Sequence, residues 1–268
     1  MTIVAPFSPF KQKPYRFAFK AAHTTTARAE CEKLIACYGN HPMEHAEAVI
    51  CLGGDGAMLE TLHDILIQGF NKPVYGINCG SVGFLMNPIK KIDLSERLNR
   101  ALAITLHPLR MKATSLHNET REALALNDVY LFRQTRQAAK IRIHIDHRVR
   151  LKELICDGIL LATPAGSTAY NLSAHGPIVP LSGNLLPLTP ICPFRPRRWR
   201  GALLPSSAHV MFTVLEYEKR PVAAVADSFE LRDITHVEVY EDRSLNVTVL
   251  FDPEQTLSDR IVIEQFRT

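Results

Sequence analysis

The apolar residues in the first third of the chain predict strands that alternate with helices. The short apolar run at 48–52 has the length and β-branched content of a strand buried on both faces, and the ranges 15–21 and 73–78 are also expected to be strands. A helix that Thr25 or Thr26 caps is expected to run to about residue 38, where Gly39 and Asn40 stop it, and the range 57–70 has helical spacing. The expected apolar face of the second helix consists of Leu59, Leu62, Leu66 and Phe70. This alternation implies parallel βαβ units, in which ligands bind at the carboxyl ends of the strands.

Beyond residue 104 the apolar pattern changes to a period of about two, which is typical of half-buried strands. The expected strands lie at 105–113, 123–132, 139–146, 148–154, 210–217, 222–226, 235–240 and 245–250. Two further helices are expected at 93–101 and 256–266. The sequence therefore predicts a Rossmann-like α/β domain over 1–100, a β-rich domain over 101–250, and a C-terminal helix within 251–268 that packs on the first domain.

The composition indicates a folded, cytoplasmic protein. The chain has 268 residues, of which 46% are hydrophobic, so it can bury one large core or two ordinary ones. No apolar run approaches the roughly 20 residues that span a bilayer. The net charge of +4 suits polyphosphate substrates but is too small to indicate nucleic-acid binding. The six cysteines lack zinc-ligand spacing, so we expect reduced thiols and no zinc site.

Three glycines surround one carboxylate where the strand at 48–52 ends. Gly53, Gly54, Asp55 and Gly56 form a strand-to-helix turn, in which glycines let a phosphate approach the backbone and the helix offers unpaired N–H groups. A carboxylate repels phosphates, so in a catalytic turn Asp55 would accept a proton or hold a cation. In the alternative interpretation, Asp55 only caps the helix.

Two further polar stretches lie close to predicted strands. The loop at 76–85 is again rich in glycine, and its Phe84 either stacks on a base or packs beneath the loop. Asn127 and Asp128 interrupt an otherwise apolar strand. An amide beside a carboxylate can bind ribose hydroxyls or an adenine edge. The alternative is a bulge or a satisfied polar pair.

The stretch at 157–177 is the densest functional signal. A buried strand enters a turn of small and hydroxyl-bearing residues and leaves as the start of a helix, which suits a pyrophosphate or a sugar. The run from Gly166 to Tyr170 lacks the G-x-S-x-G elbow of serine hydrolases, so acyl transfer is not expected. We expect His175 to be structural.

The segment at 194–200 combines four arginines with Phe194 and Trp199. This composition is typical of a phosphate or nucleic-acid patch. Because prolines interrupt the short run, the alternative is a loop at an oligomer interface or beside the nucleotide site.

Taken together, four stretches resemble the NAD kinase family: 53–56, 76–85, Asn127 with Asp128, and 163–177. Their order and spacing match as well, and the resemblance extends from about residue 15 to residue 251. The Thr-Pro-x-Gly-Ser-Thr-Ala-Tyr-Asn-Leu-Ser-Ala stretch is highly specific. It separates the chain from diacylglycerol kinases and phosphofructokinases, which share only the Gly-Gly-Asp-Gly turn.

The resemblance implies transfer of the γ-phosphoryl group of ATP to the 2′-hydroxyl of the adenosine ribose of NAD, forming NADP, with Mg²⁺ as cofactor. Asp55 would be the general base or would orient the hydroxyl, and Gly53, Gly54 and Gly56 would bind the phosphate donor. The residues that the resemblance places at NAD are Gly56, Phe84, Asn127, Asp128, Asp157, Ala165, Thr168, Ala169, Tyr170, Asn171 and Ser173. No metal ligand is assigned. A homodimer or homotetramer is expected, with no nucleic-acid or membrane partner.

The chain departs from the family pattern at several positions. Ala165 stands where Thr or Ser is usual, and 226–228 replaces a frequent Asp-Gly pair, so Asp227 receives no role. Two other functions are alternatives. A regulatory protein would bind NAD without turnover, against which the retained Asp55 argues. A lipid kinase would need a membrane-binding amphipathic segment, which the sequence lacks.

Overall fold

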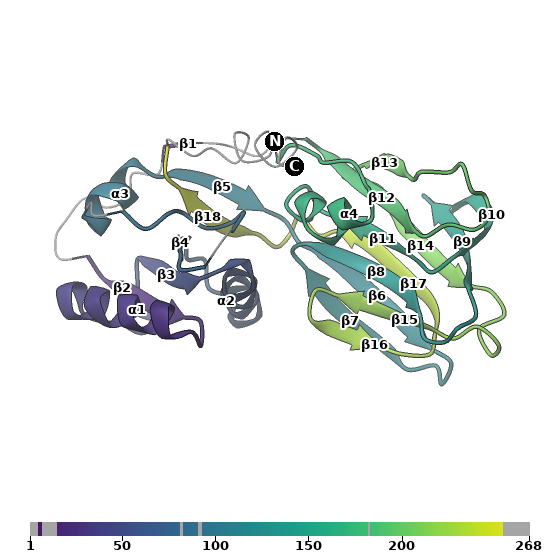
Figure 1. The fold of residues 1–268 in the computed structure, drawn as a ribbon, viewed down its shortest axis with the longest axis horizontal. Helices are drawn as coiled ribbons and strands as arrows, with labels where there is room; N and C mark the ends of the chain where they lie inside the picture. The colour runs from purple at the N-terminus through teal and green to yellow at the C-terminus, as the bar shows by residue number, and fades with distance from the viewer. Residues whose placement is uncertain (1–4, 7–14, 81–82, 91–92, 182, 254–268) are drawn as a thin grey trace. The chain divides into compact units, whose positions relative to one another are not determined.

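The computed structural model describes residues 5–6, 15–80, 83–90, 93–181 and 183–253, which divide into two compact units (Figure 1). The first unit contains residues 1–106 and 245–268, and the second contains residues 107–244. These limits differ from the predicted ranges because the strand expected at 245–250 belongs to the first unit. The helix expected at 256–266 lies outside the described residues.

The first unit is built on one six-stranded sheet. Its strand order is β1 (Ala5–Pro6), β5 (Leu102–Leu106), β18 (Val247–Phe251), β4 (Val74–Asn78), β3 (Ala48–Gly53) and β2 (Phe17–Ala21). The four strands from β18 to β2 are parallel, whereas β5 runs antiparallel to β18. The helices are α1 (Thr25–Tyr38), α2 (Asp55–Gln68) and α3 (Leu94–Arg100), with a short 3₁₀ turn at Met43–His45. The predicted α/β alternation is confirmed.

Helices α1 and α2 cover opposite faces of this sheet. Buried α1 residues share a core with Ile50 and Leu52 of β3. On the other face of β3, the Thr61 hydroxyl of α2 donates a hydrogen bond to the Cys51 sulfur. The buried residues of α2 are Met58, Thr61, Leu62 and Ile65, so the predicted apolar face is wrong except for Leu62. Helix α2 begins at Asp55, earlier than predicted, because Gly54 is its N-cap.

The second unit consists of two six-stranded antiparallel sheets, which confirms its β-rich character. The first has the order β10 (Arg148–Cys156), β9 (Ala139–Ile145), β14 (Val210–Val214), β17 (Ile234–Glu241), β6 (Leu109–Ser115) and β7 (Thr120–Ala125). The second has the order β13 (Ala202–Pro205), β12 (Leu185–Ile191), β11 (Gly158–Ala162), β8 (Asp128–Arg133), β15 (Val222–Ala226) and β16 (Phe229–Leu231). One buried core contains Phe212 and Val237 from the first sheet with Leu131 and Ile159 from the second, so the sheets pack face to face.

Two expected strands are each divided in the structure. The range 105–113 forms β5 in the first unit and β6 in the second, because Pro108 lies between them and cannot donate to a ladder. The range 123–132 forms β7 in one sheet and β8 in the other. Strand β11 leads into a 3₁₀ turn at Gly166–Thr168 and the short helix α4 (Tyr170–Ser173). Strands β12, β13 and β16 are not among the predictions.

The cysteines are all free thiols, as expected. Cys31, Cys51 and Cys156 are buried, whereas Cys37 and Cys192 are exposed. Among the described residues, no helix has the length and apolar character needed to cross a membrane.

Candidate functional site

Asp55 joins the two glycine-rich motifs of the first unit. The Phe84 N–H donates to Oδ2 of Asp55 at 2.7 Å, and the Leu85 N–H donates to Oδ1 at 2.9 Å. Both carboxylate oxygens are therefore held by the loop that follows β4. The interpretation that Asp55 only caps α2 is wrong, because Gly54 is the N-cap and the Asp55 carboxylate binds this loop.

The glycines of the turn have different surroundings. A Cβ atom on Gly53 would lie 2.8 Å from the Ala22 Cβ and 2.9 Å from the Ala57 Cβ, so close packing requires glycine there. Apart from its chain neighbours and the adjacent helix backbone, a Cβ atom on Gly54 or Gly56 would meet no described atom within 4 Å. Packing thus explains Gly53, whereas Gly54 and Gly56 leave open space above the start of α2.

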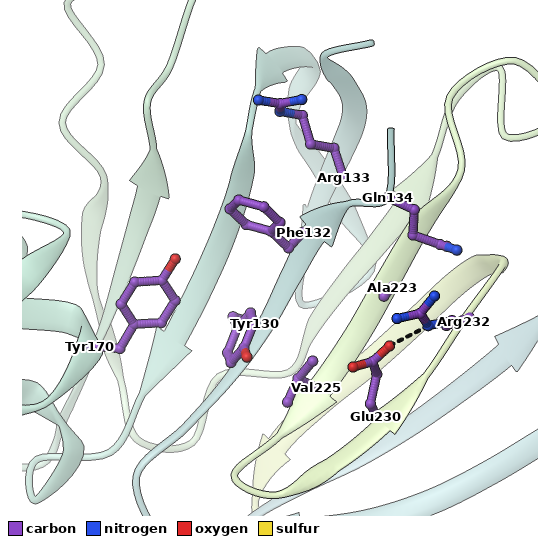
Figure 2. Close-up of a pocket in the computed structure, with 9 residues that line it drawn as sticks. All are labelled: Tyr130, Phe132, Arg133, Gln134, Tyr170, Ala223, Val225, Glu230 and Arg232. Atoms are coloured by element: carbon purple, nitrogen blue, oxygen red, sulfur yellow. Dashed lines mark hydrogen bonds and ion pairs between the residues drawn. The ribbon is translucent and has the colours of Figure 1, made fainter. Parts of the chain in front are cut away.

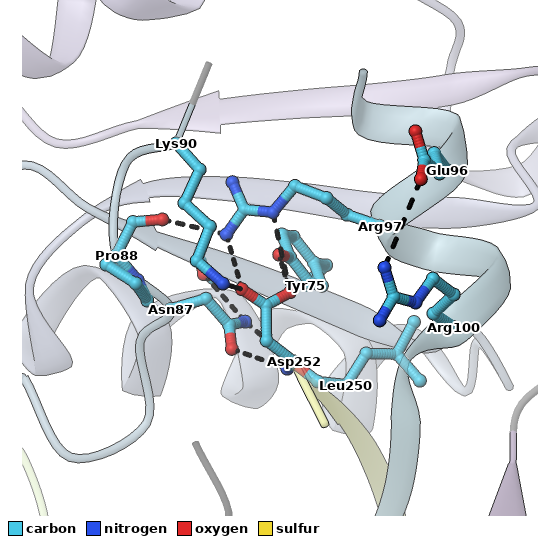
Figure 3. A network of polar contacts seen from close by, with 10 residues as sticks. Tyr75, Asn87, Pro88, Lys90, Glu96, Arg97, Arg100, Leu250 and Asp252 are labelled. Carbon is cyan, nitrogen blue, oxygen red and sulfur yellow. Dashed lines mark hydrogen bonds and ion pairs between the residues drawn. The ribbon is translucent and has the colours of Figure 1, made fainter. Parts of the chain in front are cut away.

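A buried polar network fixes the base of the loop that holds Asp55 (Figure 3). Asn87 is completely buried, and its side-chain amide donates to the carbonyl groups of Gly76 and Leu250 at 3.1 and 3.0 Å. Its side-chain oxygen accepts the Asp252 N–H at 2.9 Å. The Asn78 N–H closes the loop by donating to the Asn87 carbonyl at 2.7 Å. The loop is therefore tied to β4 and β18 at its base and to Asp55 farther along.

Asp252 anchors this network as a buried anion. Burial opposes its ionisation, but hydrogen bonds from Arg97 and Tyr75 outweigh burial and lower the pKa of Asp252. The Tyr75 hydroxyl lies 2.6 Å from Oδ1, and Arg97 Nη2 lies 2.8 Å from Oδ2 (Figure 3). Lys90 Nζ lies 3.3 Å from the same Oδ2. These contacts give Asp252 a structural task.

In the second unit, Asn127 and Asp128 lie where the chain passes from β7 to β8. The Thr163 N–H donates to the Asn127 carbonyl at 2.8 Å, and the Thr163 hydroxyl donates to the Leu126 carbonyl at 2.7 Å. A Cβ atom on Gly166 would lie 2.0 Å from the Asn127 carbonyl oxygen. The structure therefore packs the Asn127 backbone directly against the loop at 163–166. The stretch is a crossing between sheets and not a bulge.

Asp128 is a buried acid. Its exposed fraction is 5%, and among the described residues no group donates a hydrogen bond to its carboxylate. Burial, and after it the negative charge of Asp227, raises the pKa of Asp128 to about 7. Burial and the Asp128 charge also raise the pKa of Tyr130 and of Tyr170. A group that binds to Asp128 therefore meets a carboxyl without an internal partner.

A pocket of about 430 Å³ opens beside Tyr170, one of the predicted NAD residues (Figure 2). The Tyr130 and Tyr170 rings meet edge to face, with their centroids 5.2 Å apart. The lining residues are Tyr130, Phe132, Arg133, Gln134, Tyr170, Ala223, Val225, Glu230 and Arg232. Sequence reasoning missed all of these except Tyr170. The period-two alternation along β8, which puts Asp128, Tyr130 and Phe132 on one face, was the available signal.

Some of the other predicted NAD residues have side chains with hydrogen bonds inside the protein, and others are accessible to solvent. Asp157 accepts a hydrogen bond from Arg133 Nε at 2.6 Å. Asn171 is completely buried, and its side chain contacts the carbonyl groups of Ser167 and Pro177 and the Thr189 hydroxyl. The accessible positions, partly or fully exposed, are Ala165, Thr168, Ala169, Tyr170 and Ser173.

The basic segment lies in the connection between β12 and β13. Phe194 is 48% exposed, and the guanidinium groups of Arg195 and Arg197 lie 5.5 and 5.0 Å from the centre of its ring. Trp199 packs against the core of the second unit. The arginines are exposed, whereas the tryptophan is used for packing.

The described part of the chain contains no group of three or more His, Cys, Asp or Glu side chains that could hold a metal ion. Magnesium in phosphoryl-transfer sites commonly binds through one or two carboxylates together with the substrate phosphates. Asp55 is a carboxylate at the start of α2.

Comparisons with known proteins match nearly the whole chain. The model of the ATP-NAD kinase N-terminal domain matches residues 9–105, and that of the ATP-NAD kinase C-terminal domain matches residues 126–242. The NAD kinase of Caulobacter vibrioides is 53% identical over 259 residues, which cover 96% of this chain and 99% of that protein. The NAD kinase of Rhizobium meliloti is 52% identical over 249 residues, which cover 93% and 96%.

Two solved structures share the fold. Yeast NADH kinase complexed with NADH has a TM-score of 0.76 at 22% identity, covering 99% of this chain and 92% of that one. An NAD kinase from Archaeoglobus fulgidus in complex with ATP has a TM-score of 0.69 at 20% identity, covering 90% and 94%. The predicted α/β plus β-rich fold class is therefore confirmed.

Proposed function

The chain belongs to the NAD kinase family and phosphorylates NAD to NADP with ATP, and we propose that Asp55 orients the 2′-hydroxyl of the adenosine ribose and accepts its proton as general base in this transfer. The observation that supports this role is the pair of N–H groups from Phe84 and Leu85 on the Asp55 carboxylate. Each carboxylate oxygen retains acceptor capacity after accepting one N–H. A hydroxyl can therefore donate to a carboxylate whose direction is already fixed.

To catalyse phosphoryl transfer, the protein mainly has to align the hydroxyl with the phosphate and neutralise the phosphate charge. The O2′ atom forms a bond to the γ-phosphorus while the bond to the bridging oxygen breaks and ADP leaves. The hydroxyl proton passes to Asp55 as the new bond forms. Since the transition state of such transfers is loose, positioning the nucleophile contributes much of the acceleration. A carboxylate held by two N–H groups suits this task.

The phosphate donor would bind at the start of α2. The open space beside Gly54 and Gly56 lets phosphate oxygens approach the backbone, and the first N–H groups of a 14-residue helix attract anions. Asp55 fits a Mg²⁺ ion that arrives with the donor phosphates, because this ion needs few protein ligands. When bound, Mg²⁺ would neutralise phosphate charge.

The second unit would bind NAD. We place the adenosine half at Asn127 and Asp128, because the buried carboxyl of Asp128 has acceptor capacity that no described residue uses. The residues expected to line the rest of the dinucleotide are Asp157, Ala165, Thr168, Ala169, Tyr170 and Ser173. Asn171 would support this loop from within, since its amide is already engaged by three internal hydrogen bonds. A homodimer or homotetramer stays a prediction, which light scattering would test.

Substitution of Asp55 by asparagine tests the proposed role. The amide keeps the shape, but its NH₂ group faces one of the two loop N–H groups and loses that hydrogen bond. We expect kcat for NADP formation with ATP and Mg²⁺ to fall at least about 100-fold, in the range of a lost general base. The dissociation constant for NAD, measured by calorimetry, should change less than about tenfold.

Asp64→Asn is the matched control, because Asp64 lies on the same helix and pairs with Lys20. Its turnover should stay within about twofold of the unchanged protein, because this ion pair is partly exposed and lies outside the glycine-rich turn. Equal turnover of the two variants would remove Asp55 from the mechanism.

A further inference from the structure

Asp227 accepts hydrogen bonds on its carboxylate from three consecutive peptide N–H groups. It lies in the turn between β15 and β16 with φ +48°, a left-handed conformation that aspartate tolerates better than most residues. Its Oδ2 accepts the Leu126 N–H at 2.7 Å. Its Oδ1 accepts the N–H groups of Asn127 at 3.1 Å and Asp128 at 3.3 Å. One carboxylate thus holds the backbone at 126–128.

The position of this stretch explains why it needs such a partner. Strand β7 ends at Ala125 in one sheet and β8 begins at Asp128 in the other, so Leu126 and Asn127 belong to no ladder. Buried peptide groups require hydrogen-bond partners. Thr163 satisfies the carbonyl groups of Leu126 and Asn127, and Asp227 satisfies their N–H groups. The crossing is therefore fixed from two sides.

We propose that Asp227 is a positioning residue for NAD binding, because its carboxylate fixes the peptide groups at 126–128 and thereby the directions of the Asn127 and Asp128 side chains. The inference rests on the proposed role of these two residues at NAD. Asp227 acts through them and does not itself contact the dinucleotide. Hydrogen bonds from N–H groups to a carboxylate are stronger than those to a neutral acceptor, so the charge matters as well as the shape.

The negative charge of Asp227 provides a second measurement that tests the proposal, the pH at which Asp128 ionises. Asp128 faces Asp227 from the β15–β16 turn, Tyr130 on its own strand and Tyr170 on α4. The negative charge of Asp227 disfavours ionisation of Asp128. Replacing Asp227 with asparagine should therefore move the ionisation of Asp128 to lower pH. A purely structural residue elsewhere in the unit would not move it.

The test measures NAD binding by calorimetry and steady-state kinetics on the full chain. Asp227→Ala should weaken NAD binding at least tenfold, raising KM for NAD while kcat at saturating NAD stays within about threefold. Asp227→Asn keeps one acceptor and should weaken binding about threefold, with the inflection in the pH profile of NAD affinity shifted to lower pH. The asparagine variant keeps the test valid if the alanine variant does not fold.

Asp146 provides matched controls in the same unit. It also has a positive φ, lies in the turn between β9 and β10, and accepts a backbone N–H, that of His209, at 3.0 Å. Asp146→Ala and Asp146→Asn should leave NAD affinity within about twofold. NAD affinity within twofold for a folded Asp227→Ala, or for Asp227→Asn with an unmoved pH inflection, would overturn the proposal.

Asn127→Ala separates this proposal from the one on which it rests. Weaker NAD binding in Asn127→Ala with unchanged binding in both Asp227 variants would overturn only the positioning role. Unchanged binding in Asn127→Ala and in Asp128→Asn would overturn the NAD site at this stretch, and the positioning role with it.

Discussion

In the turns that carry Asp55 and Asp128, the side chains of these two residues differ in their hydrogen bonding and in their burial. Two backbone N–H groups hold the Asp55 carboxylate, and the neighbouring Gly54 and Gly56 leave open space. Asp128 is buried, receives no hydrogen bond from a described residue, and lies near a second acid, Asp227. The first turn is open around a fixed charge. The second is closed around a carboxyl that is partly neutral near pH 7.

The glycines near Asp55 and near Asp128 also differ in the space around them. Gly54 and Gly56 meet nothing that a side chain would displace, whereas Gly166 lies directly against the Asn127 backbone. Packing explains Gly53 and Gly166, whereas it leaves Gly54 and Gly56 unexplained. Glycine content alone therefore does not identify a phosphate-binding loop. The surroundings of each glycine decide between the two explanations.

The largest expected effect is that of Gly166→Ala on stability. Its new Cβ would lie 2.0 Å from the Asn127 carbonyl oxygen, a backbone atom that no rotamer change can move. We expect the free energy of unfolding, measured by urea denaturation, to fall by more than about 4 kcal/mol, beyond ordinary overpacking. Gly54→Ala is the control and should lose less than about 1 kcal/mol. Equal losses in both variants would remove the distinction between the two turns.

The next effect is the pH dependence that Asp128 gives to stability. Its pKa is raised from 3.8 to about 7, so between these values the folded state keeps a proton that the unfolded state loses. The free energy of unfolding therefore falls as pH rises through this window. Relative to Asp128→Asn, the unchanged protein should lose about 2 kcal/mol between pH 4 and pH 8, roughly half of what three pKa units correspond to.

Asp242 is a control of opposite sign for this measurement. Burial opposes its ionisation, but hydrogen bonds from Ser244 and Arg110 outweigh burial and lower its pKa. Asp242 therefore raises the free energy of unfolding at pH values above its ordinary pKa, and this stabilisation is lost as pH falls. Asp242→Asn should destabilise the protein at neutral pH and have little effect in strong acid. The same pH slope for both variants would contradict the assignment to Asp128.

The smallest effect concerns Gly56, which is exposed in the first turn of α2. Alanine favours helix over glycine, so Gly56→Ala should raise the free energy of unfolding by up to about 1 kcal/mol. If the space above Gly56 receives substrate, kcat/KM for ATP should nevertheless fall at least about tenfold, or about 1.4 kcal/mol. A stabilised variant with unchanged kcat/KM would show that no ligand uses this space.

The sequence predicted the elements whose signals are local. Strand β15 has the expected bounds, 222–226, and helix α1 ends before Gly39, where the chain turns to a positive φ. The predictions are wrong where the tertiary structure decides. The range 123–132 was predicted as one strand interrupted by Asn127 and Asp128, yet it supplies strands to two sheets. Strand β12 was missed because Pro187 and Pro190 lie within it, and proline argues against a strand.

In the candidate functional site, too, the sequence predicts the local motif but not the contacts between distant residues. The motif at 53–56 pointed to Asp55, but no spacing rule shows that its carboxylate is bound by Phe84 and Leu85. Asp227 received no role in the sequence interpretation because 226–228 departs from the family's Asp-Gly pair, and its partners lie about 100 residues earlier in the chain. Long-range hydrogen bonds of this kind leave no periodic pattern in the sequence.

The position of β18 sets an order of events during synthesis. This strand lies between β4 and β5, yet it follows the entire second unit along the chain. A growing polypeptide that has left the ribosome only as far as residue 244 holds every strand of the second unit, whereas the first unit lacks an inner strand. Leu250 and Asp252, which fix Asn87 and the loop that holds Asp55, are synthesised after the entire second unit. The base of the loop that holds Asp55 therefore cannot take its described hydrogen bonds until the chain extends past residue 252.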